Sequence, residues 1–286
     1  MNRTPTKTTL PNNGAELAQL SDFFAQYRHI FVLTGAGIST ASGIPDYRDH
    51  KGEWKRKTPI QHQDFIDKAA VRKRYWARSL LGWRYFGKAA PSAGHLALAQ
   101  LEEAGHIALI VTQNVDGLHQ RAGSKNVIDL HGRIGHLLCL ECGARSTRAE
   151  FQPKLEAHNS RYTKLAAHMA PDGDADLDLD SFDDFNVPAC EHCGGVIMPD
   201  VVFYGGSVPK PRVAEACAGL DAADAVLVAG SSLMVYSGYR FCKAAAEQGK
   251  PIAAINLGVT RADHLLEFKV EMPCCDALQS LLPGPA

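Results

Sequence analysis

Residues 29–39 read His-Ile-Phe-Val-Leu-Thr-Gly-Ala-Gly-Ile-Ser, and this stretch decides the class of fold. Its apolar first half is typical of a short strand that is buried on both faces of a parallel sheet. Gly35 and Gly37 follow at once, and glycines at such a strand end let backbone amides approach a diphosphate where a helix begins. Thr40 stands where a full Gly-x-Gly-x-x-Gly pattern has its third glycine. The pattern alone therefore leaves two interpretations open, a nucleotide site and a plain tight turn.

Similar apolar runs recur along the chain and alternate with helical patterns. The expected strands are 107–111, 126–130, 225–229 and 252–256, and the expected helices include 15–28, 94–104 and 238–249. Strands that alternate with helices predict an α/β fold with a doubly wound parallel sheet. The Rossmann-like domain that we expect comprises residues 15–48, 94–131 and 200–282. We expect residues 1–14 to be a flexible N-terminus.

Two cysteine pairs interrupt the alternation, Cys139-Leu-Glu-Cys142 and Cys190-Glu-His-Cys193, and a glycine follows each pair. A Cys-x-x-Cys turn places two sulfurs on one side of a bend, and two such turns supply the four thiolates that tetrahedral zinc prefers. Two disulfides or a redox pair are the alternatives, but neither pair has the strand-then-helix context of a thioredoxin motif. We therefore predict one structural zinc ion. The 47 residues between Cys142 and Cys190 predict an insertion within this zinc ribbon.

A smaller, inserted domain is expected from two stretches that leave the strand–helix pattern. Residues 49–93 form its helical part and residues 132–199 its zinc-binding part. The first stretch interleaves aromatic residues with Arg and Lys, which can bind single-stranded nucleic acid. At helical spacing this is more typical of an amphipathic subdomain with snorkelling cations. Because the formal net charge of −1 gives no long-range attraction to nucleic acid or membranes, we expect neither partner.

Composition and the N-terminal sequence narrow the class of protein. The chain has 286 residues, of which 45% are hydrophobic and 21% charged, as is ordinary for a soluble globular protein. No apolar run approaches the roughly 20 residues of a membrane span, and the first fourteen residues lack the apolar core of a secretory signal. We expect a cytoplasmic protein, with the mitochondrial matrix as the alternative, and slightly favour a monomer.

An acidic run at residues 171–186 lies between the two cysteine pairs. It lacks the glycine and the glutamate that a calcium-binding EF-hand loop requires. We therefore expect a solvated surface loop there.

Polar residues follow several of the expected strands. Gln113, Asn114 and Asp116 come after the strand at 107–111, and His131 comes after the next strand. The triplets Gly230-Ser231-Ser232 and Asn256-Leu257-Gly258 follow two later strands. The carboxyl ends of parallel strands meet at one edge of a sheet, where doubly wound folds bind ligands, so these groups should share one crevice. A lone histidine is usually a core residue, but beside a Gln-Asn-x-Asp cluster His131 is a candidate general base.

Six motifs occur in a fixed order together with the two cysteine pairs. They are Gly35-Ala-Gly-Ile-Ser39, Gly43-Ile-Pro-Asp-Tyr-Arg48, Thr112-Gln-Asn-Val-Asp-Gly-Leu-His119, Asp129-Leu-His-Gly132, Pro199-Asp-Val-Val-Phe-Tyr-Gly205 and Gly230-Ser-Ser-Leu233. Together they resemble the sirtuin family of NAD-dependent protein deacylases, over residues 29 to about 278. Shorter stretches such as Val235-Tyr-Ser-Gly-Tyr-Arg240 resemble its class II branch.

The resemblance implies that NAD is a consumed co-substrate and that zinc is structural. The implied NAD contacts are Gly35, Ala36, Gly37, Ser39, Asp46, Tyr47, Arg48, Gln113, Asn114, Asp116, Gly230, Ser231, Ser232, Asn256, Leu257 and Gly258. Asp46, Tyr47 and Arg48 would form a mobile loop over the nicotinamide, although by residue type alone Arg48 could be a surface salt-bridge arginine. Cys274 and Cys275 compete for one contact with the adenine.

The resemblance also implies the reaction. His131 is the general base, and Asn114 and Asp116 are the other catalytic residues. The products are free lysine, nicotinamide and O-acyl-ADP-ribose. Acyl-lysine peptides are the implied partners, flanked by Val201, Val202 and Phe203 and by residues 232–234.

The preferred acyl group stays open. Tyr75 and Arg78 share one face if they lie on a helix. A Tyr–Arg pair at this spacing binds an acidic acyl group in one sirtuin branch, and a helix-surface arginine is the alternative. Two further functions also stay open: mono-ADP-ribosyl transfer to protein at the same NAD site, and a low-turnover NAD-sensing scaffold.

Overall fold

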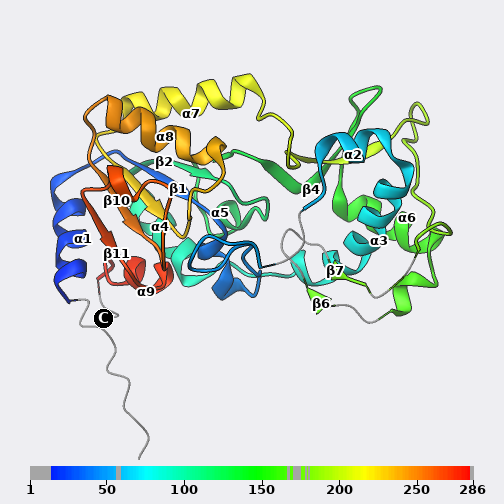
Figure 1. Cartoon of the computed structure of the whole chain (residues 1–286), viewed down its shortest axis with the longest axis horizontal. Helices are drawn as coiled ribbons and strands as arrows, with labels where there is room; N and C mark the ends of the chain where they lie inside the picture. The colour runs from blue at the N-terminus through cyan, green and yellow to red at the C-terminus, as the bar shows by residue number, and fades with distance from the viewer. Residues whose placement is uncertain are drawn as a thin grey trace, which may run out of the picture.

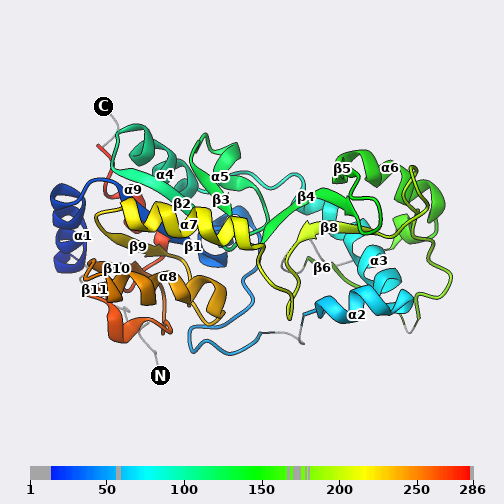
Figure 2. The same cartoon turned by 90° about the horizontal axis from the view of Figure 1, so that it is seen from above.

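The computed structural model describes residues 14–55, 59–165, 168–169, 175–177, 179 and 181–283. The predicted flexible segment 1–14 therefore lies outside the described residues, apart from Gly14. Two lobes lie side by side, and both views show β4 passing from one into the other (Figures 1 and 2). No described helix is long and apolar enough to cross a bilayer.

A six-stranded parallel sheet forms the centre of the first lobe, which we call the large lobe. Its strands are β1 (Ile30–Thr34), β2 (Ile107–Thr112), β3 (Val127–Asp129), β9 (Val226–Ala229), β10 (Ile252–Ile255) and β11 (Phe268–Val270). The spatial order is β11-β10-β9-β1-β2-β3, and every neighbouring pair is parallel. Strands that spread in both directions from β1 make a doubly wound Rossmann-like sheet, as the sequence predicts. The switch in direction lies between β1 and β9, where such sheets bind ligands.

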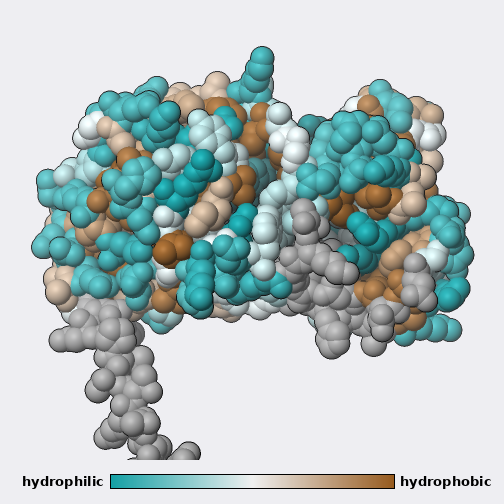
Figure 3. Space-filling model, viewed as in Figure 1, coloured by the Kyte–Doolittle hydropathy of each residue, from teal (hydrophilic) through white to brown (hydrophobic). Residues whose placement is uncertain are grey.

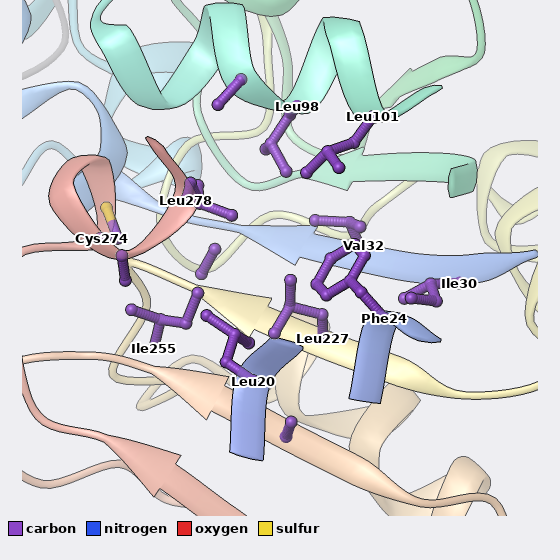
Figure 4. Close-up of a cluster of buried hydrophobic side chains, with 14 of the residues drawn as sticks. Leu20, Phe24, Ile30, Val32, Leu98, Leu101, Leu227, Ile255, Cys274 and Leu278 are labelled. Atoms are coloured by element: carbon purple, nitrogen blue, oxygen red, sulfur yellow. The ribbon is translucent and has the colours of Figure 1, made fainter. Parts of the chain in front are cut away.

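Helices cover both faces of this sheet. Helices α1 (Gly14–Gln26), α4 (Ala93–Glu103) and α9 (Cys274–Gln279) pack on one face, and α7 (Lys210–Ala222) and α8 (Tyr236–Glu247) pack on the other. Side chains of β1 point alternately to the two faces of the sheet. Ile30 and Val32 join the core cluster under α1, α4 and α9, while Phe31 and Leu33 join the cluster under α7 and α8. Figure 4 shows the first cluster, with side chains of α1 and α4 meeting the strands. Burial on both faces explains the continuous apolar runs.

The second lobe, which we call the small lobe, contains the two cysteine pairs. Its antiparallel sheet has the order β5-β4-β8, and its helices flank that sheet. The elements are β4 (Gly132–Cys139), β5 (Arg145–Thr147), β8 (Ile197–Val201), α2 (His62–Asp67), α3 (Ala69–Phe86) and α6 (Arg148–His158), with the short pair β6 (His168–Met169) and β7 (Ala175–Asp176). Helices α2 and α3 confirm a helical part within 49–93, while the exact domain boundaries stay a prediction.

The acidic run differs from the solvated loop that the sequence predicts. In its described part, Ala175 and Phe185 are each 1% exposed, and Leu177 and Leu179 pack against the core cluster of the small lobe. Its apolar residues recur at every second position, so one side of the extended segment faces the core. The expectation of a loop that is solvated throughout is therefore wrong for these residues. Asp172, Asp174, Asp178 and Asp180 lie outside the described residues.

The two sheets are joined by a very short piece of chain. Strand β3 ends at Asp129 and β4 begins at Gly132, so His131 lies directly in the joint. Gly132 has a φ of 84°, and a Cβ there would lie 2.0 Å from the carbonyl oxygen of Asp200. Only glycine fits this junction. The candidate base is therefore placed by both lobes at once.

Candidate active site

The glycine turn after β1 touches the loop after β9, backbone against backbone. The amide of Gly37 donates to the carbonyl of Gly230 over 2.8 Å. A Cβ on Gly37 would lie only 2.8 Å from the Cα of Gly230, which explains a glycine at each position. The turn continues as a 3-10 helix, η1 (Ala36–Ile38). The two loops at the switch point thus form one continuous wall.

A carboxylate and an amide are locked together beside this wall. Ser39 Oγ donates to Asp116 Oδ2 over 2.7 Å and accepts from Asn114 Nδ2 over 2.9 Å. The same amide donates to the carbonyl of Gly35 over 3.0 Å. Burial raises the pKa of Asp116, and the Leu118 amide and the Ser39 hydroxyl oppose that rise. Asn114 and Asp116, two of the side chains predicted to converge at the sheet edge, are therefore both hydrogen-bonded to Ser39.

Gln113 links the ends of three neighbouring strands. Its Nε2 donates to Ser231 Oγ over 2.7 Å, after β9, and to the carbonyl of Thr34 over 3.3 Å, at the end of β1. Ser231 Oγ also accepts from the amide of Leu233, whose φ of 56° is unusual for a residue with a side chain. Such strained positions occur where function requires a fixed loop shape.

Hydrogen bonds on both ring nitrogens orient His131. Nδ1 lies 2.8 Å from the carbonyl oxygen of Gln113, and Nε2 lies 2.7 Å from Ser237 Oγ. A carbonyl can only accept, so Nδ1 carries the proton and Nε2 is the basic nitrogen of the neutral ring. Burial lowers the pKa of His131, the Gln113 carbonyl opposes this, and the charges of Arg212 and Arg240 add to the lowering. His131 is therefore neutral near pH 7 and able to accept a proton at Nε2.

The four cysteines of the small lobe converge as the sequence predicts. The Sγ atoms of Cys139, Cys142, Cys190 and Cys193 all lie within 4.8 Å of one another. The pairs Cys139–Cys193 and Cys142–Cys190 are 3.5 and 3.8 Å apart, too far for disulfides. A zinc tetrahedron with Zn–S bonds of about 2.3 Å has edges of about 3.8 Å. The four thiols fit a structural zinc site with four protein ligands, which would leave no open coordination position on the metal for a substrate.

A sequence model of the Sir2 family matches residues 35–237, more than half of the chain. The chain belongs to the Sir2 family.

Relatives and solved structures resemble this sirtuin over nearly its full length. A protein of Bordetella pertussis named NAD-dependent protein deacetylase is 55% identical over 269 residues, covering 94% of this chain and 98% of the relative. A protein of the same name from Xanthomonas campestris pv. campestris is 58% identical over 266 residues, covering 93% and 91%. The structure of a Sir2 histidine-to-alanine variant with deacetylated p53 peptide and 3'-O-acetyl ADP ribose has a TM-score of 0.75 at 30% identity. It covers 93% of this chain and 96% of that one.

The predicted cofactor loop of this sirtuin is stacked on aromatic rings. Tyr47 packs edge-on against Trp54 and Tyr204, with centroid distances of 6.1 and 6.2 Å. The Arg48 guanidinium lies 3.9 Å from the Trp54 ring centroid and donates to the carbonyl of Gly52 over 2.7 Å. Asp46 forms an ion pair with Lys55. Arg48 is thus not a simple salt-bridge arginine, and its role toward a phosphate or ribose stays a prediction.

The predicted adenosine end lies at the carboxyl end of β10. Asn256 is 9% exposed and donates through Nδ2 to the carbonyls of Leu257 and Gly258, while Leu257 is 56% exposed. Cys274 Sγ donates to the Gly37 carbonyl over 3.4 Å, and Cys275 Sγ donates to Ser92 Oγ over 3.4 Å. Both cysteines are buried beside the glycine turn, so the structure brings together both candidates and does not choose between them.

The predicted substrate side begins at the joint between the lobes, and Figure 3 shows the surface hollowed between them. The amide of Val202 donates to the His131 carbonyl over 2.8 Å, and Val201 packs beside the apolar cluster around Ile134. The Phe203 ring lies 5.3 Å from that of Tyr75, which is 6% exposed. These contacts place the end of β8 between the candidate base and an aromatic cluster.

Tyr75 and Arg78 lie on α3, as the helical spacing predicts, but they contact different groups. Tyr75 belongs to the aromatic cluster, whereas Arg78 Nε donates to the carbonyl of Ala175 in β7 over 2.8 Å. Their joint role in binding an acyl carboxylate stays a prediction.

Sequence reasoning missed Ser237 as a functional residue. It lies in the first turn of α8 and contacts the basic nitrogen of His131. The available signal was a serine in the first turn of a helix that closely follows the Gly230-Ser231 strand end. That signal was weak because 106 residues separate the two side chains.

Proposed function

We propose that this sirtuin is an NAD-dependent protein deacetylase that transfers acyl groups from lysine side chains to ADP-ribose, releasing nicotinamide. The observation that carries the proposal is the state of His131, a neutral imidazole whose Nδ1 is held by the Gln113 carbonyl and whose basic Nε2 lies 2.7 Å from Ser237 Oγ. The names of the bacterial relatives support the same activity.

The glycine turn and the polar strand ends are the proposed NAD site. The backbone of the glycine turn, Gly35 to Gly37, lies close to the phosphates. The loop at Gly230 to Ser232 and the polar end of β10 receive the adenosine side, and Asp116 faces the nicotinamide amide. Asp46 to Arg48 close over the nicotinamide end. Bound NAD supplies an electrophilic ribose carbon once nicotinamide leaves. The chain itself supplies a fixed frame, since Ser39, Asn114 and Asp116 already hydrogen-bond to one another.

His131 is the proposed general base. Its Nε2 accepts a proton from a ribose hydroxyl, and the Gln113 carbonyl stabilises the imidazolium through Nδ1. General-base catalysis of this kind typically contributes about 10²–10⁴-fold to the rate. Ser237 Oγ lies 2.7 Å from Nε2, so this hydrogen bond has to break when the substrate hydroxyl binds there.

The substrate peptide is proposed to bind as an added strand between Val201–Phe203 and the loop at 232–234. Backbone hydrogen bonds then supply affinity with little dependence on the flanking side chains. The neighbouring Sir2 structure with a deacetylated p53 peptide supports a peptide substrate. Closed zinc coordination gives the metal no part in the chemistry, so we assign it the role of bracing the small lobe.

Mass spectrometry of a reaction with NAD and an acetyl-lysine peptide tests the proposal. We expect nicotinamide, the deacetylated peptide and O-acetyl-ADP-ribose from the wild type. His131→Ala should remain folded and lose at least about 10²-fold in turnover. His136→Ala is the matched control, because His136 is an exposed histidine on β4. ADP-ribosylated protein without deacetylation would favour the transferase alternative, and no NAD consumption would favour the scaffold.

Acyl breadth is tested separately with acetyl-, succinyl-, glutaryl- and branched-acyl peptides. If Arg78 binds an acyl carboxylate, Arg78→Ala should selectively lower turnover of the acidic acyl groups. An equal loss on every acyl group would exclude this role and leave Arg78 as a structural contact of β7.

A further inference from the structure

Three arginines, Arg212, Arg240 and Arg261, have no carboxylate partner in the described parts of the chain. Arg212 lies in the first turn of α7 and donates to the Leu130 carbonyl over 3.3 Å, and its charge contributes to lowering the pKa of His131. Arg240, on α8, contributes in the same way. Arg261 follows β10 and donates through Nη1 to the carbonyl of Met234 over 3.2 Å. Unbalanced guanidinium groups near a reaction site attract anions.

Arg240 and Arg261 stack on two tyrosines of α8. The Cζ atoms of Arg240 and Arg261 lie 5.4 and 5.7 Å from the ring centroid of Tyr236, and that of Arg261 lies 4.6 Å from the Tyr239 ring. We call these four residues the arginine–tyrosine cluster. A guanidinium that stacks on an aromatic face can still bind a carboxylate through its edge, and in Arg261 one nitrogen of that edge, Nη1, already donates to the Met234 carbonyl.

The cluster borders the proposed substrate strand. Arg261 is tied to the 232–234 loop twice, because its amide also donates to the Ser232 carbonyl over 2.8 Å. Tyr236 is 51% exposed and directly precedes Ser237, whose hydroxyl contacts His131. In the proposed binding mode, a peptide strand that pairs beside residues 232–234 lies next to Arg261, which contacts Ser232 and Met234.

Asp263, the acidic residue nearest to the cluster in sequence, already has other partners, whereas one N–H donor of the cluster has none in the described residues. Asp263 accepts from Thr260 and forms an ion pair with Lys269. Nε of Arg240 is buried without a hydrogen-bond partner in the described residues. A buried unpaired donor costs free energy until a ligand satisfies it.

We propose that the arginine–tyrosine cluster binds an aspartate or glutamate side chain of the substrate protein, close in sequence to the acyl-lysine. This inference rests on the proposed deacetylase function and adds a substrate class to it. Backbone pairing alone recognises any extended peptide, so the cluster supplies side-chain selectivity.

A peptide series tests the inference. Each peptide carries one acetyl-lysine and, at a single flanking position scanned from two residues before it to two after it, Glu, Gln or Lys. We expect kcat/KM for the best Glu peptide to exceed that of its Gln twin by about tenfold, the value of a hydrogen bond to a charged group. Arg261→Glu should reverse the preference toward the Lys peptide. Lys243→Glu is the control, since it makes the same charge change on α8 at a residue paired with Glu247.

Arg240→Gln is a second variant, which leaves the contacts of Arg261 with the 232–234 loop in place and should reduce the preference for Glu. A wild type that turns over all three peptides equally would overturn the inference and leave the deacetylase function standing. An equal loss on all peptides in Arg261→Glu would overturn it too, by assigning Arg261 a structural role. The inference would also be overturned if succinyl-lysine peptides, compared with the acetyl-lysine series, showed that the preference depends on a carboxylate on the acyl group. If no peptide is turned over, the deacetylase function fails, and fluorescence anisotropy of the same labelled peptides still tests the cluster through their Kd ranking.

Discussion

The two lobes are stabilised by different means. Every residue of β1, β9 and β10 in the large lobe is buried, whereas every residue of β5 in the small lobe is exposed. The large lobe has a six-stranded parallel sheet with helices on both faces, while the small lobe has a three-stranded antiparallel sheet, the short pair β6–β7, and four thiols that converge on one point. From this difference we expect the large lobe to be stabilised by apolar burial alone, and the small lobe to need zinc in addition to its apolar cluster.

The division of labour follows the same line. The polar side chains of the proposed chemistry come from strand ends of the large lobe and from the joint, while the cysteines only shape the opposite wall. All three tryptophans, Trp54, Trp76 and Trp83, lie between residues 49 and 93, outside the strands and helices of the large lobe. Trp76 lies in the core cluster of the small lobe, so its emission reports on that lobe, and hydrogen exchange in β1 and β9 reports on the large lobe.

Removing zinc should produce the largest effect. Structural zinc contributes about 10–16 kcal/mol of folding free energy in small zinc domains. We expect chelation, or Cys190→Ser, to shift the emission of Trp76, which shares a core cluster with Cys139 and Cys190. Turnover should be lost because β8 no longer positions the substrate strand.

Amide exchange in β1 and β9 should stay slow in the zinc-free protein. Cys217→Ser provides the control, since Cys217 packs beside the large-lobe core on α7. Loss of protection in both lobes at one chelator concentration would contradict the comparison and make the chain a single cooperative unit.

Low pH should have the second-largest effect, by destabilising the large lobe. Burial lowers the pKa of His95 to about 4, and burial, together with the neighbouring His95, lowers that of His119 well below its usual 6.5. The two rings are 4.7 Å apart. The unfolded chain takes up these protons near pH 6.5, but the folded chain does not. Stability is therefore complete above about pH 6.5 and falls by about 1.4 kcal/mol per pH unit for each histidine as the pH drops toward 4.

Hydrogen exchange in β1, measured from pH 7 to 5 and corrected for the intrinsic rate, gives this slope without interference from the zinc thiolates. His119→Asn should flatten it by roughly one proton. An unchanged slope in that variant would show that other groups control the acid sensitivity.

A side chain at Gly37, where the sheet changes direction, should lower the free energy of unfolding by a smaller amount than acid does. Gly37→Ala forces a Cβ to within 2.8 Å of the Gly230 Cα, and overpacking of this kind typically costs about 1–3 kcal/mol. We expect a lower urea midpoint and weaker NAD binding by calorimetry. Gly135→Ala is the matched control in the small lobe, because its nearest neighbour, the Trp83 ring, is 3.8 Å away. Equal effects of the two substitutions would rule out the close backbone approach as the reason for Gly37.

Helix caps should give the smallest effect and the finest contrast. Thr147 and Ser92 each begin a helix with a reciprocal capping pair. Thr147→Ala should cost about 1 kcal/mol, because its hydroxyl is in an exposed pair with Glu150. Ser92→Ala should cost more, since the buried Ser92 hydroxyl also donates to the Ile38 carbonyl over 2.8 Å. Urea titrations of both variants measure the difference, and an equal cost would mean that burial adds nothing to the cap.

The sequence predicts the large lobe well because its evidence is local. A strand that is buried on both faces is apolar throughout, so β1, β2, β9 and β10 can be located to within about one residue from composition alone. The cysteine spacing likewise predicts the four thiols that the structure brings together. In both cases the signal lies within a few neighbouring residues.

Contacts between distant residues could not be predicted in the same way. Ser39 meets Asp116 across 77 positions, and His131 meets Ser237 across 106. Such pairs depend on strand order and on where each helix begins, which no short pattern encodes. The acidic run illustrates a second limit, since its aspartates hide an every-second-residue apolar pattern that packs Leu177 and Leu179 on the core.

The joint between β3 and β4 has a mechanical consequence. The His131 carbonyl accepts a hydrogen bond from the Val202 amide, and Gly132 pairs with Val201, so the candidate base and the strand proposed to flank the substrate are held by the same short segment. If the small lobe rotates relative to the large lobe about this segment, the segment itself moves little. The proton acceptor and the peptide edge then turn together and keep their separation. Opening wide enough to admit a bulky protein substrate therefore need not misalign the two reacting partners.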